Sequence, residues 1–404
     1  MTENSGLFDI VVIGGGIVGL AAAMKAQQRY PDLKVSVLET EREVAAHQSG
    51  HNSGVLHSGL YYKPGSSKAI NCRAGLKAME SFCGEHSIPH ERCGKVVVAT
   101  TEQELSRLDA IADRATQNEV KFDRLDTDAL RECEPSAAGI AAIHVPETGI
   151  VNYRGVCEKM ADEIRFRGGS VELGFEVCQI ETESDSIVLT SRRGEKRSCG
   201  HLINCGGLNS DRVFTMAGGK PTVRIVPFRG EYYELSPGRE SLCRNLIYPV
   251  PDPSFPFLGV HFTRMIDGGV ECGPNAVLAL SRQGYRWRDF SFQDTLETLK
   301  FGGFRSLAAK HWRMGLGEMH RSLSKAAFVT ALQKLIPSLT SNDLVPGRSG
   351  VRAQAVTPEG NLVDDFCIEQ SFNAVHVLNA PSPAATASLA IADQVLDRLE
   401  LGNQ

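Results

Sequence analysis

The most constraining part of this sequence lies near its N-terminus, where an apolar strand, a glycine-rich turn, a helix and a second strand follow one another. The segments are, in chain order, the strand 8–13, the glycines Gly14, Gly16 and Gly19, the helix 20–28, the strand 35–38 and a final Glu39. This order predicts a βαβ unit that binds a dinucleotide. G-x-G-x-x-G spacing alone would be weak evidence, but here every flanking element is in register with it.

The residues of this unit have separate predicted roles. Gly14 allows the tight turn, and Gly19 lets the helix pack closely on the strand. Gly16 lets a pyrophosphate approach the backbone beside Ile17, at the start of the helix. Glu39 is placed to accept hydrogen bonds from ribose hydroxyls. A carboxylate there disfavours a 2′-phosphate, so we expect an adenosine-based cofactor without one.

Composition narrows the class of protein. The chain has 404 residues, of which 42% are hydrophobic, enough for a substantial core and for two domains. The formal charge is −5 and no block of like charge occurs, so we expect a small-molecule partner and no nucleic acid. The 11 cysteines are odd in number and include no C-x-x-C pair, which argues against a disulfide framework and a zinc site. We expect reduced thiols in a cytoplasmic compartment.

The N-terminal region predicts neither a leader nor a membrane span. The first strand begins within ten residues of Met1, which leaves no room for a signal or transit peptide before it. The apolar stretch 10–24 is too short to cross a bilayer and contains four glycines. Peripheral attachment at the inner face of the cell membrane stays open, because it needs only a modest exposed apolar or basic patch.

We expect an α/β fold in which two domains interleave along the chain. A Rossmann-like nucleotide-binding domain is assembled from three segments, and a substrate domain carries a mixed or antiparallel β-sheet with flanking helices. The predicted nucleotide-binding segments are 1–85, 146–220 and 340–404, and the substrate domain comprises 86–145 and 221–339. The strand 201–204 is expected to return to the nucleotide sheet. The strands 344–353 and 376–379 and the helix 384–399 are expected to complete it.

Several further motifs go beyond a nucleotide-binding fold. They are the loop 48–62 (QSGHNSGVLHSGLYY), Cys205-Gly206-Gly207, 350–354 (GVRAQ) and 379–386 (NAPSPAAT). Together they resemble the FAD-dependent oxidoreductases of the D-amino-acid oxidase and glycerol-3-phosphate dehydrogenase group. Within that group the chain resembles the family that oxidises L-2-hydroxyglutarate. The matching segments are 51–63, 227–230, 248–252, 255–263, 273–279, 350–355 and 379–386.

The resemblance implies the reaction and its partners. FAD would take a hydride at its N5 atom from C2 of L-2-hydroxyglutarate, giving 2-oxoglutarate. Electrons would pass to a quinone or another electron-transport acceptor, or to oxygen. We favour non-covalent FAD, because Cys367 is near the C-terminal motif in sequence but lies in a polar stretch after Asp364 and Asp365. Besides the first βαβ unit, the expected FAD contacts are Gln48, Ser49, Asn52, Ser53, Gly54, Val177, Gly206, Gly207, Gly350, Arg352, Ala384, Ala385 and Thr386.

The helix that begins at Ala384 has a predicted electrostatic role. Its N-terminal dipole would stabilise the reduced, anionic flavin near N1 and O2. The wider superfamily usually has glycines at this turn, whereas Pro381 and Pro383 occupy it here.

Alcohol oxidation needs a base for the hydroxyl proton, and imidazole suits that role near neutral pH. His57, which follows the cofactor-facing loop, and His261, on an expected strand of the substrate domain, are the candidates. Either could instead be a hydrogen-bonded structural histidine. Tyr62 and Tyr248 are expected to donate hydrogen bonds to the substrate.

A five-carbon dicarboxylate needs a cation at each end, preferably arginine with its two-pronged geometry. Arg352 is the candidate for the C1 carboxylate or for the cofactor itself. Arg229 is the candidate for the other carboxylate, and an ion pair between Arg229 and Glu231 is an equally weighted interpretation.

Two other functions remain open at this stage. An FAD-dependent amine or amino-acid oxidase would share the fold but would need no base for a hydroxyl group. A non-catalytic flavin-binding subunit would be yellow but would not be bleached by small acids. An NAD-dependent dehydrogenase is least favoured, because no second nucleotide motif is visible.

Overall fold

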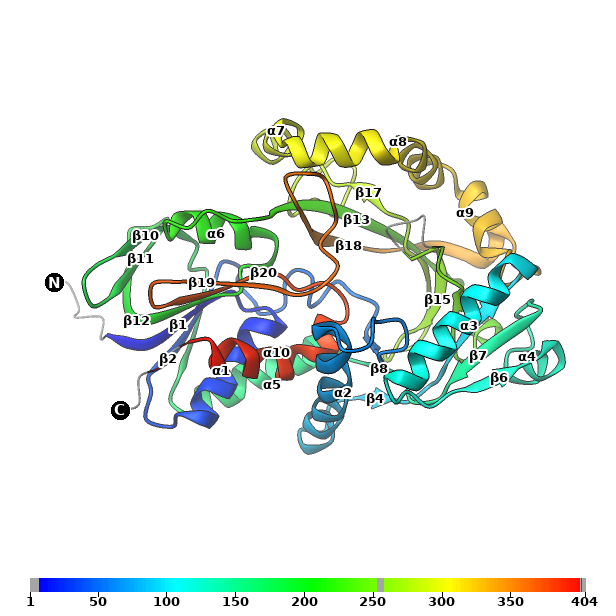
Figure 1. The fold of residues 1–404 in the computed structure, drawn as a ribbon, viewed down its shortest axis with the longest axis horizontal. Coiled ribbons are helices and arrows are strands. Elements are labelled where there is room, and N and C mark those ends of the chain that lie inside the picture. Colours follow the sequence, from blue (N-terminus) through cyan, green and yellow to red (C-terminus); the bar gives the residue numbers. More distant parts are fainter. Residues whose placement is uncertain (1–6, 253–257, 400, 402–404) are drawn as a thin grey trace.

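The computed structural model describes residues 7–252, 258–399 and 401 of the chain. Figure 1 shows two sheets at opposite ends of an elongated molecule, with helices packed around each. The chain passes between them several times, so each sheet is built from segments that lie far apart in the sequence.

The first sheet has eight strands in the order β10-β11-β12-β1-β2-β9, and β20 and β19 extend it from β12. Its strands are β1 (Phe8–Ile13), β2 (Val35–Glu39), β9 (Ser170–Leu173), β10 (Val177–Thr182), β11 (Ile187–Ser191), β12 (Lys196–Asn204), β19 (Cys367–Ser371) and β20 (Ala374–Asn379). The central pairs β12–β1, β1–β2, β2–β9 and β12–β20 are parallel, as a nucleotide-binding sheet requires.

Helices cover both faces of this sheet. On one face lie α1 (Ile17–Arg29), α2 (Ser67–Glu85), α5 (Tyr153–Phe166) and α10 (Ala384–Asp397), and on the other lies α6 (Ser210–Met216) (Figure 1). The alternation of β1 explains this arrangement, because Ile10 and Val12 belong to the core cluster beneath α1. Val11 and Ile13 belong to the cluster that includes Val213 of α6.

The second sheet has nine strands in the order β17-β13-β16-β15-β14-β5-β7-β6, with β18 also paired to β13. Its strands are β5 (Lys95–Ala99), β6 (Asp123–Leu125), β7 (Ala141–Val145), β13 (Arg224–Leu235), β14 (Leu246–Pro249), β15 (His261–Arg264), β16 (Val270–Gly273), β17 (Val277–Leu278) and β18 (Leu344–Val356). Only β14–β5 pairs in parallel among the described strands of this sheet, so the sheet is mixed, as predicted.

The remaining elements flank the second sheet and join the two. The helices are α3 (Glu102–Gln117), α4 (Thr127–Cys133), α7 (Phe292–Lys300), α8 (Gly302–Leu323) and α9 (Lys325–Leu332). A small sheet of β3 (Val55–Leu56), β8 (Gly149–Val151) and β4 (His90–Glu91) lies between the two large ones. None of the described helices combines the length and the apolar character that a membrane span needs.

Two strand predictions need comment. The segment 344–353 does not complete the nucleotide sheet, because β18 pairs with β13 from Leu344↔Leu235 to Val356↔Arg224. A strand pattern does not specify its pairing partner. Here β18 pairs with the long strand β13, and of the two predicted strands only β20 joins the nucleotide sheet, where it pairs with β12. The strand expected to carry His261 spans 257–262 in the sequence; residue 257 lies outside the described residues, and the observed strand β15 begins at His261.

Candidate active site

The turn after β1 requires glycine at two positions. Gly14 has a φ of +109°, and a Cβ atom there would overlap the carbonyl oxygen of Cys205. A Cβ atom on Gly19 would overlap the carbonyl oxygen of Gly14. The end of β1, the start of α1 and the end of β12 therefore approach each other as closely as the glycine spacing predicted.

The N-terminus of α1 is completed by a residue from a distant loop. Gly16 is the N-cap and has no side chain to accept a hydrogen bond from the first turn. Ser49 supplies the missing acceptor, since its Oγ accepts a hydrogen bond from the backbone N–H of Ile17 at 2.9 Å. Gly16 and Ile17 line the cavity described below, so this helix end is available to an anion.

Glu39 ends β2 beside this turn. Its Oε2 accepts a hydrogen bond from the N–H of Gly15 at 2.5 Å, and its Oε1 accepts one from the N–H of Glu41 at 2.8 Å. Each carboxylate oxygen has a second lone pair, so both can still accept hydrogen bonds from ribose hydroxyls. The two backbone N–H groups therefore orient the carboxylate of Glu39 before a ligand binds.

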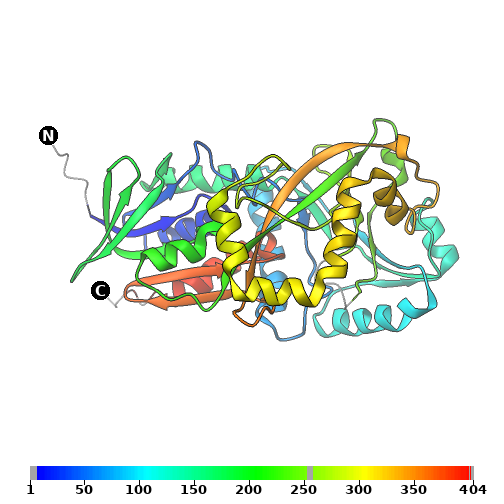
Figure 2. The same cartoon turned by 90° about the horizontal axis from the view of Figure 1, so that it is seen from above.

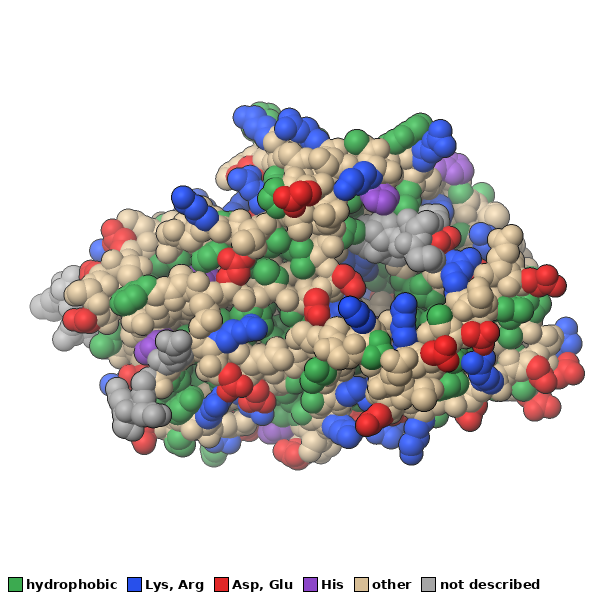
Figure 3. Space-filling model, viewed as in Figure 1, with side chains coloured by type: hydrophobic (Ala, Val, Ile, Leu, Met, Phe, Trp, Pro, Cys, Tyr) green, Lys and Arg blue, Asp and Glu red, His purple; other side chains and the backbone are tan. Residues whose placement is uncertain are grey.

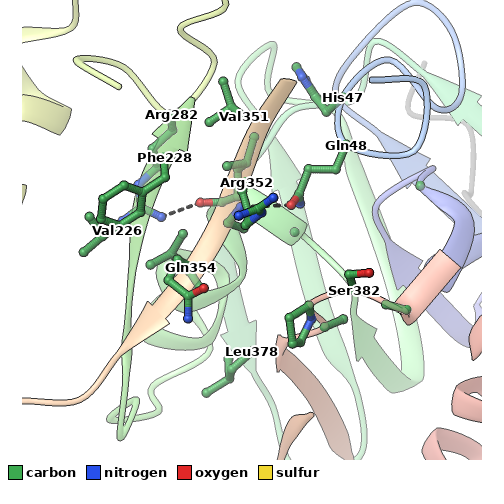
Figure 4. Close-up of a pocket in the computed structure, with 18 of the residues that line it drawn as sticks. His47, Gln48, Val226, Phe228, Arg282, Val351, Arg352, Gln354, Leu378 and Ser382 are labelled. Carbon is green, nitrogen blue, oxygen red and sulfur yellow. Dashed lines mark hydrogen bonds between the residues drawn. The ribbon is translucent and has the colours of Figure 1, made fainter. Parts of the chain in front are cut away.

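The loop after β2 packs against β18 of the second sheet. The Oε1 of Gln48 accepts a hydrogen bond from the N–H of Ala353 at 2.9 Å, and His51 donates from Nδ1 to the carbonyl oxygen of Ser349 at 3.0 Å. A Cβ atom on Gly350 would overlap the carbonyl oxygen of His51. Figure 4 shows the side chains of Gln48 and Arg352 next to one another, with Ser382 across the same space. Loop and strand thereby form one wall.

A continuous cavity of about 2560 Å³ runs between the two sheets. This is larger than the roughly 300–1,000 Å³ of ordinary ligand pockets and has room for a dinucleotide together with a small substrate. The predicted residues that line it are Gly14, Gly16, Ile17, Gly19, Glu39, Gln48, Ser49, Asn52, Ser53, His57, Tyr62, Val177, Gly206, Gly207, Tyr248, His261, Gly350, Arg352, Ala384 and Ala385. Folding brings together residues that are more than 300 positions apart.

The two candidate bases both lie in this cavity. His57 follows β3, and its Nε2 is 3.2 Å from the Oγ of Ser382. Burial lowers the pKa of His57 well below 6.5, and the charge of Lys95 adds to the effect. The pKa of His57 also responds to the charge of His261, so protonation of one imidazole disfavours protonation of the other.

His261 is fixed more rigidly. Its Nδ1 is 2.8 Å from the carbonyl oxygen of Gly259, which can only accept, so Nδ1 carries the hydrogen and Nε2 keeps its lone pair. The ring stacks on Tyr248 with 3.9 Å between centroids. Burial, with smaller contributions from the charges of Lys95 and Arg352, lowers the pKa of His261 to about 3. Both imidazoles are therefore neutral near pH 7, as a base requires.

Lys95 is a residue that the sequence reasoning missed. It begins β5, is 1% exposed, and its Nζ lies 4.1 Å from the ring centroid of Tyr248 and 5.5 Å from that of Tyr61. Burial lowers the pKa of Lys95 to about 8. The sequence signal for Lys95 was a single cation at the start of an otherwise apolar strand, KVVVA. Ordinary strands often begin with such a residue, so the pattern did not point to a site.

Besides Tyr153, four tyrosines line the cavity, of which Tyr62 and Tyr248 were predicted and Tyr61 and Tyr232 were not. Burial raises the pKa of all four phenols above the usual 10, so they stay protonated and can donate hydrogen bonds. The hydroxyl of Tyr61 is buried and has no hydrogen-bond partner within the described part of the chain. It is a donor available to a bound ligand.

Arg229 does not lie where the substrate-binding prediction put it. Its side chain is 1% exposed, pairs with Glu231 at 2.8 Å and lies over the ring of Trp287. Along β13, Phe228 and Gly230 line the cavity and Arg229 does not. Alternate residues of a strand face opposite sides, so Arg229 points away and the ion-pair interpretation is the one observed.

Two expected cofactor contacts also lie off the cavity lining. Thr386 is fully buried, and its hydroxyl bonds to the phenol of Tyr153, to the carbonyl oxygen of Val55 and to the N–H of His57. Thr386 thus ties α10 to the segment that carries His57. Gly54 has a φ of +66° and provides the turn before β3.

The sequence was compared with models of known protein families. A model described as FAD dependent oxidoreductase matches residues 9–398. The chain belongs to this family.

Curated relatives of this flavoprotein cover nearly its whole length. The L-2-hydroxyglutarate dehydrogenase of Indibacter alkaliphilus is 53% identical over 96% of this chain and 98% of that one. The enzyme of the same name from Escherichia coli strain K12 is 46% identical over 98% and 93%, and the mitochondrial one of Homo sapiens is 44% identical over 99% and 91%. The family resemblance drawn from the motifs is confirmed.

Solved structures show how widely this flavoprotein fold is shared. The L-alpha-glycerophosphate oxidase of Mycoplasma pneumoniae with FAD bound superposes with a TM-score of 0.80 at 19% identity, over 98% of this chain and 96% of that one. The glycine oxidase of Geobacillus kaustophilus superposes with a TM-score of 0.74 at 17% identity, over 98% of this chain and 95% of that one. At such identities the likeness concerns the fold alone.

The cofactor of this flavoprotein is FAD, and the site fits it. The two sterically required glycines and the open end of α1 form a cradle for a pyrophosphate, with the oriented carboxylate of Glu39 beside it. At the other end of the cavity, Ala384 and Ala385 bring the N-terminus of α10 to the lining. This is the place where the sequence predicted stabilisation of a reduced, anionic flavin ring.

Proposed function

We propose that this protein is an FAD-dependent dehydrogenase that oxidises L-2-hydroxyglutarate to 2-oxoglutarate. The observation that carries the proposal is its 44–53% identity, over nearly the whole chain, to relatives named L-2-hydroxyglutarate dehydrogenase. The cavity supports it with two neutral imidazoles, the guanidinium of Arg352 and several protonated phenols. This is a donor and base set suited to a hydroxy dicarboxylate.

Binding of the substrate would use the cationic and phenolic groups. Arg352 is proposed to bind the C1 carboxylate or the cofactor, and the phenols of Tyr61, Tyr62 and Tyr248 to donate hydrogen bonds to the substrate. Lys95, buried behind Tyr248, would add positive potential for a dianion. Arg229 takes no part, because its guanidinium pairs with Glu231 outside the cavity.

Proton transfer would use His57. It follows directly on the loop that contacts β18 and lies beside Ser382, close to the N-terminus of α10 where the flavin ring is expected. We propose that His57 takes the hydroxyl proton while His261, held by Gly259 and Tyr248, orients the substrate. FAD, when bound, accepts the hydride released from C2. Because the two imidazoles disfavour double protonation, only one of them would hold the proton after the transfer.

The electron acceptor and the location complete the proposal. Electrons would pass to a membrane quinone or a similar electron-transport component, with oxygen as a substitute. The protein would act in the cytoplasm, attached peripherally to the inner face of the cell membrane, with non-covalent FAD. The amine-oxidase alternative has support only at the level of fold, through the glycine oxidase structure at 17% identity.

The decisive experiment is anaerobic addition of L-2-hydroxyglutarate to the purified holoprotein while the flavin absorbance is followed. Rapid bleaching by the L isomer, and none by the D isomer or by glycine, is the expected result. A flavin that stays oxidised with L-2-hydroxyglutarate but bleaches with an amine would overturn the proposal in favour of the amine oxidase.

A further inference from the structure

The region that contains α7 and α8 exposes an unusual number of large apolar side chains. Both tryptophans of the chain are among them, Trp287 at 44% and Trp312 at 57% exposure. The exposed apolar residues of this region, here called the α7–α8 surface, are Trp287, Phe290, Phe292, Leu299, Trp312, Leu316, Met319 and Leu323. A patch of this kind marks an interaction site and not ordinary solvated surface.

The second half of α8 has its apolar side turned outward. Trp312, Leu316, Met319 and Leu323 are spaced by four, three and four residues, so they form one stripe, and all four are exposed. Polar groups lie on the inward side, where Glu318 accepts a hydrogen bond from the N–H of Ala276 at 3.1 Å. An amphipathic helix normally buries such a stripe, so this one requires an apolar partner outside the chain.

Positive charge predominates among the exposed side chains of this region. Six cationic side chains are exposed between residues 286 and 323, namely Arg286, Arg288, Lys300, Arg305, Lys310 and Arg313. No Asp or Glu in that segment, all of which the structure describes, is fully exposed. Asp294 and Glu297 both pair with Arg212. The surface therefore offers apolar contact and positive charge together, which matches an anionic bilayer.

The layout of the helices suits a flat partner. Figure 1 shows α7 and α8 along the upper edge of the molecule, and Figure 2, seen from above, shows the same yellow helices spread over the face turned to the viewer. The halves of α8 turn in different directions because His311 has non-helical dihedral angles. Figure 3 shows hydrophobic, Lys and Arg side chains gathered along that upper edge. Tryptophan, which prefers the membrane–water interface, occurs in this chain only here.

We propose that the α7–α8 surface docks the protein onto an anionic lipid bilayer. Phe301, Leu307 and His311 of the same helices line the cavity. A lipid-dissolved acceptor would therefore reach the cavity from the docked side. The route of the acceptor rests on the proposed function, and the α7–α8 surface is the part of the chain that would make the peripheral attachment proposed there.

The test uses the holoprotein with vesicles of phosphatidylcholine, with and without phosphatidylglycerol. Because Trp287 and Trp312 are the only tryptophans, their emission reports this surface directly. We expect a shift to shorter wavelength and co-sedimentation with the anionic vesicles, both weakened by salt. The double variant Leu316→Ser/Leu323→Ser should bind about tenfold or more weakly. The double variant Arg288→Gln/Arg313→Gln should bind anionic vesicles about tenfold more weakly, with no change on vesicles of phosphatidylcholine alone.

The control is Phe166→Ser on α5, where an 86% exposed aromatic side chain lies in the other domain and binding should be unchanged. Anionic vesicles that leave the emission and the sedimentation unchanged would overturn the proposal. So would a dimer in solution that Leu316→Ser/Leu323→Ser dissociates, since a second copy would then cover the surface. Flavin reduction by L-2-hydroxyglutarate without vesicles tests the proposed function separately and should be unaffected in all these variants.

Discussion

His261 lies with its ring stacked on Tyr248, with 3.9 Å between the ring centroids and 28° between the ring planes. The stack and the hydrogen bond from Nδ1 to Gly259 hold the imidazole in one position and one tautomer. The orientation of this cavity-lining histidine thus depends on a neighbour from the adjacent strand β14, which pairs with β15.

The stack predicts that the aromatic ring of Tyr248 matters more for the rate of flavin reduction than its hydroxyl group. Tyr248→Leu should slow anaerobic flavin reduction by L-2-hydroxyglutarate by about tenfold, because His261 loses its stacking partner. Tyr248→Phe keeps the ring and should retain most of the rate at saturating substrate, while the loss of the proposed hydrogen bond from its hydroxyl raises the substrate concentration needed to reach that rate. Stopped-flow absorbance separates the two. Equal losses in both variants would mean that the hydroxyl, and not the stack, is what counts.

His57→Ala should leave FAD bound and slow flavin reduction by on the order of 10²-fold or more, because the proposed base is removed. Ser382→Ala, which removes only the hydroxyl 3.2 Å from Nε2, is the matched control and should cost less. FAD content is read from the absorbance spectrum and the rate from single-turnover reduction. An unchanged rate in His57→Ala would exclude this histidine from the mechanism.

The lowered pKa values of His57 and His261 predict the acid side of the pH profile. A base is lost when it is protonated, so the reduction rate should hold as the pH falls through about 6.5, where an unshifted histidine would already be protonated. Single-turnover rates between about pH 5 and 8 measure this. A midpoint near 6.5 would contradict the burial-driven shift.

The two arginines should respond in opposite ways. Arg352→Met should raise KM for L-2-hydroxyglutarate or weaken FAD binding by about 10- to 100-fold, because a charged hydrogen-bond donor leaves the cavity. Arg229→Met should leave KM nearly unchanged but lower the free energy of unfolding by about 3 kcal/mol, since Glu231 loses its partner. Steady-state kinetics measure the change in KM, and denaturant unfolding measures the change in the free energy of unfolding. A large KM effect in Arg229→Met would restore its predicted substrate role.

Ser49 caps α1 from outside the helix, which links the loop to cofactor binding. Ser49→Ala should lower stability by about 1 kcal/mol and weaken reconstitution of the apoprotein with FAD. Ser66→Ala removes a similar cap from α2, where Ser66 accepts from the N–H of Ala69, and should lower stability without changing FAD affinity. FAD titration of the two apoproteins distinguishes a local effect from a general one.

His376 predicts how stability depends on pH. It is fully buried between Asn204 and Ser371, and burial lowers its pKa to about 4. The unfolded chain binds a proton below about 6.5 and the folded one does not, so stability falls as the pH drops from about 6.5 towards 4. The contribution is about 1.4 kcal/mol per pH unit. Denaturant unfolding of His376→Gln at several pH values should show a slope smaller by that amount.

Much of the nucleotide half of the fold was predictable because its signals are local. The strand 8–13 is β1 as observed, and the glycines occupy positions that a side chain would block. Steric limits at a turn and a two-residue alternation depend only on neighbouring residues. The same locality explains why His57 and Arg352 were found, since each sits within a long motif.

The partners of β18 and Arg229 were not predictable in the same way. A strand pattern does not name its neighbour, and β18 joined β13 of the second sheet. The direction of Arg229 depends on which face of β13 meets the cavity, and that is set by the packing of the two sheets. Lys95 belongs to the same class, because only the tertiary structure places it beside Tyr248.

The sequence by itself determined the nucleotide-binding unit, the family and the residue types available for catalysis, because those follow from short-range spacing and motif order. Only the tertiary structure decided which side chains share the cavity and which face of α8 meets solvent. The spacing of Trp312, Leu316, Met319 and Leu323 predicts one apolar face in any fold. Whether that face turns inward or outward depends on what else packs against the helix, and here its inner side is held by polar contacts such as that of Glu318.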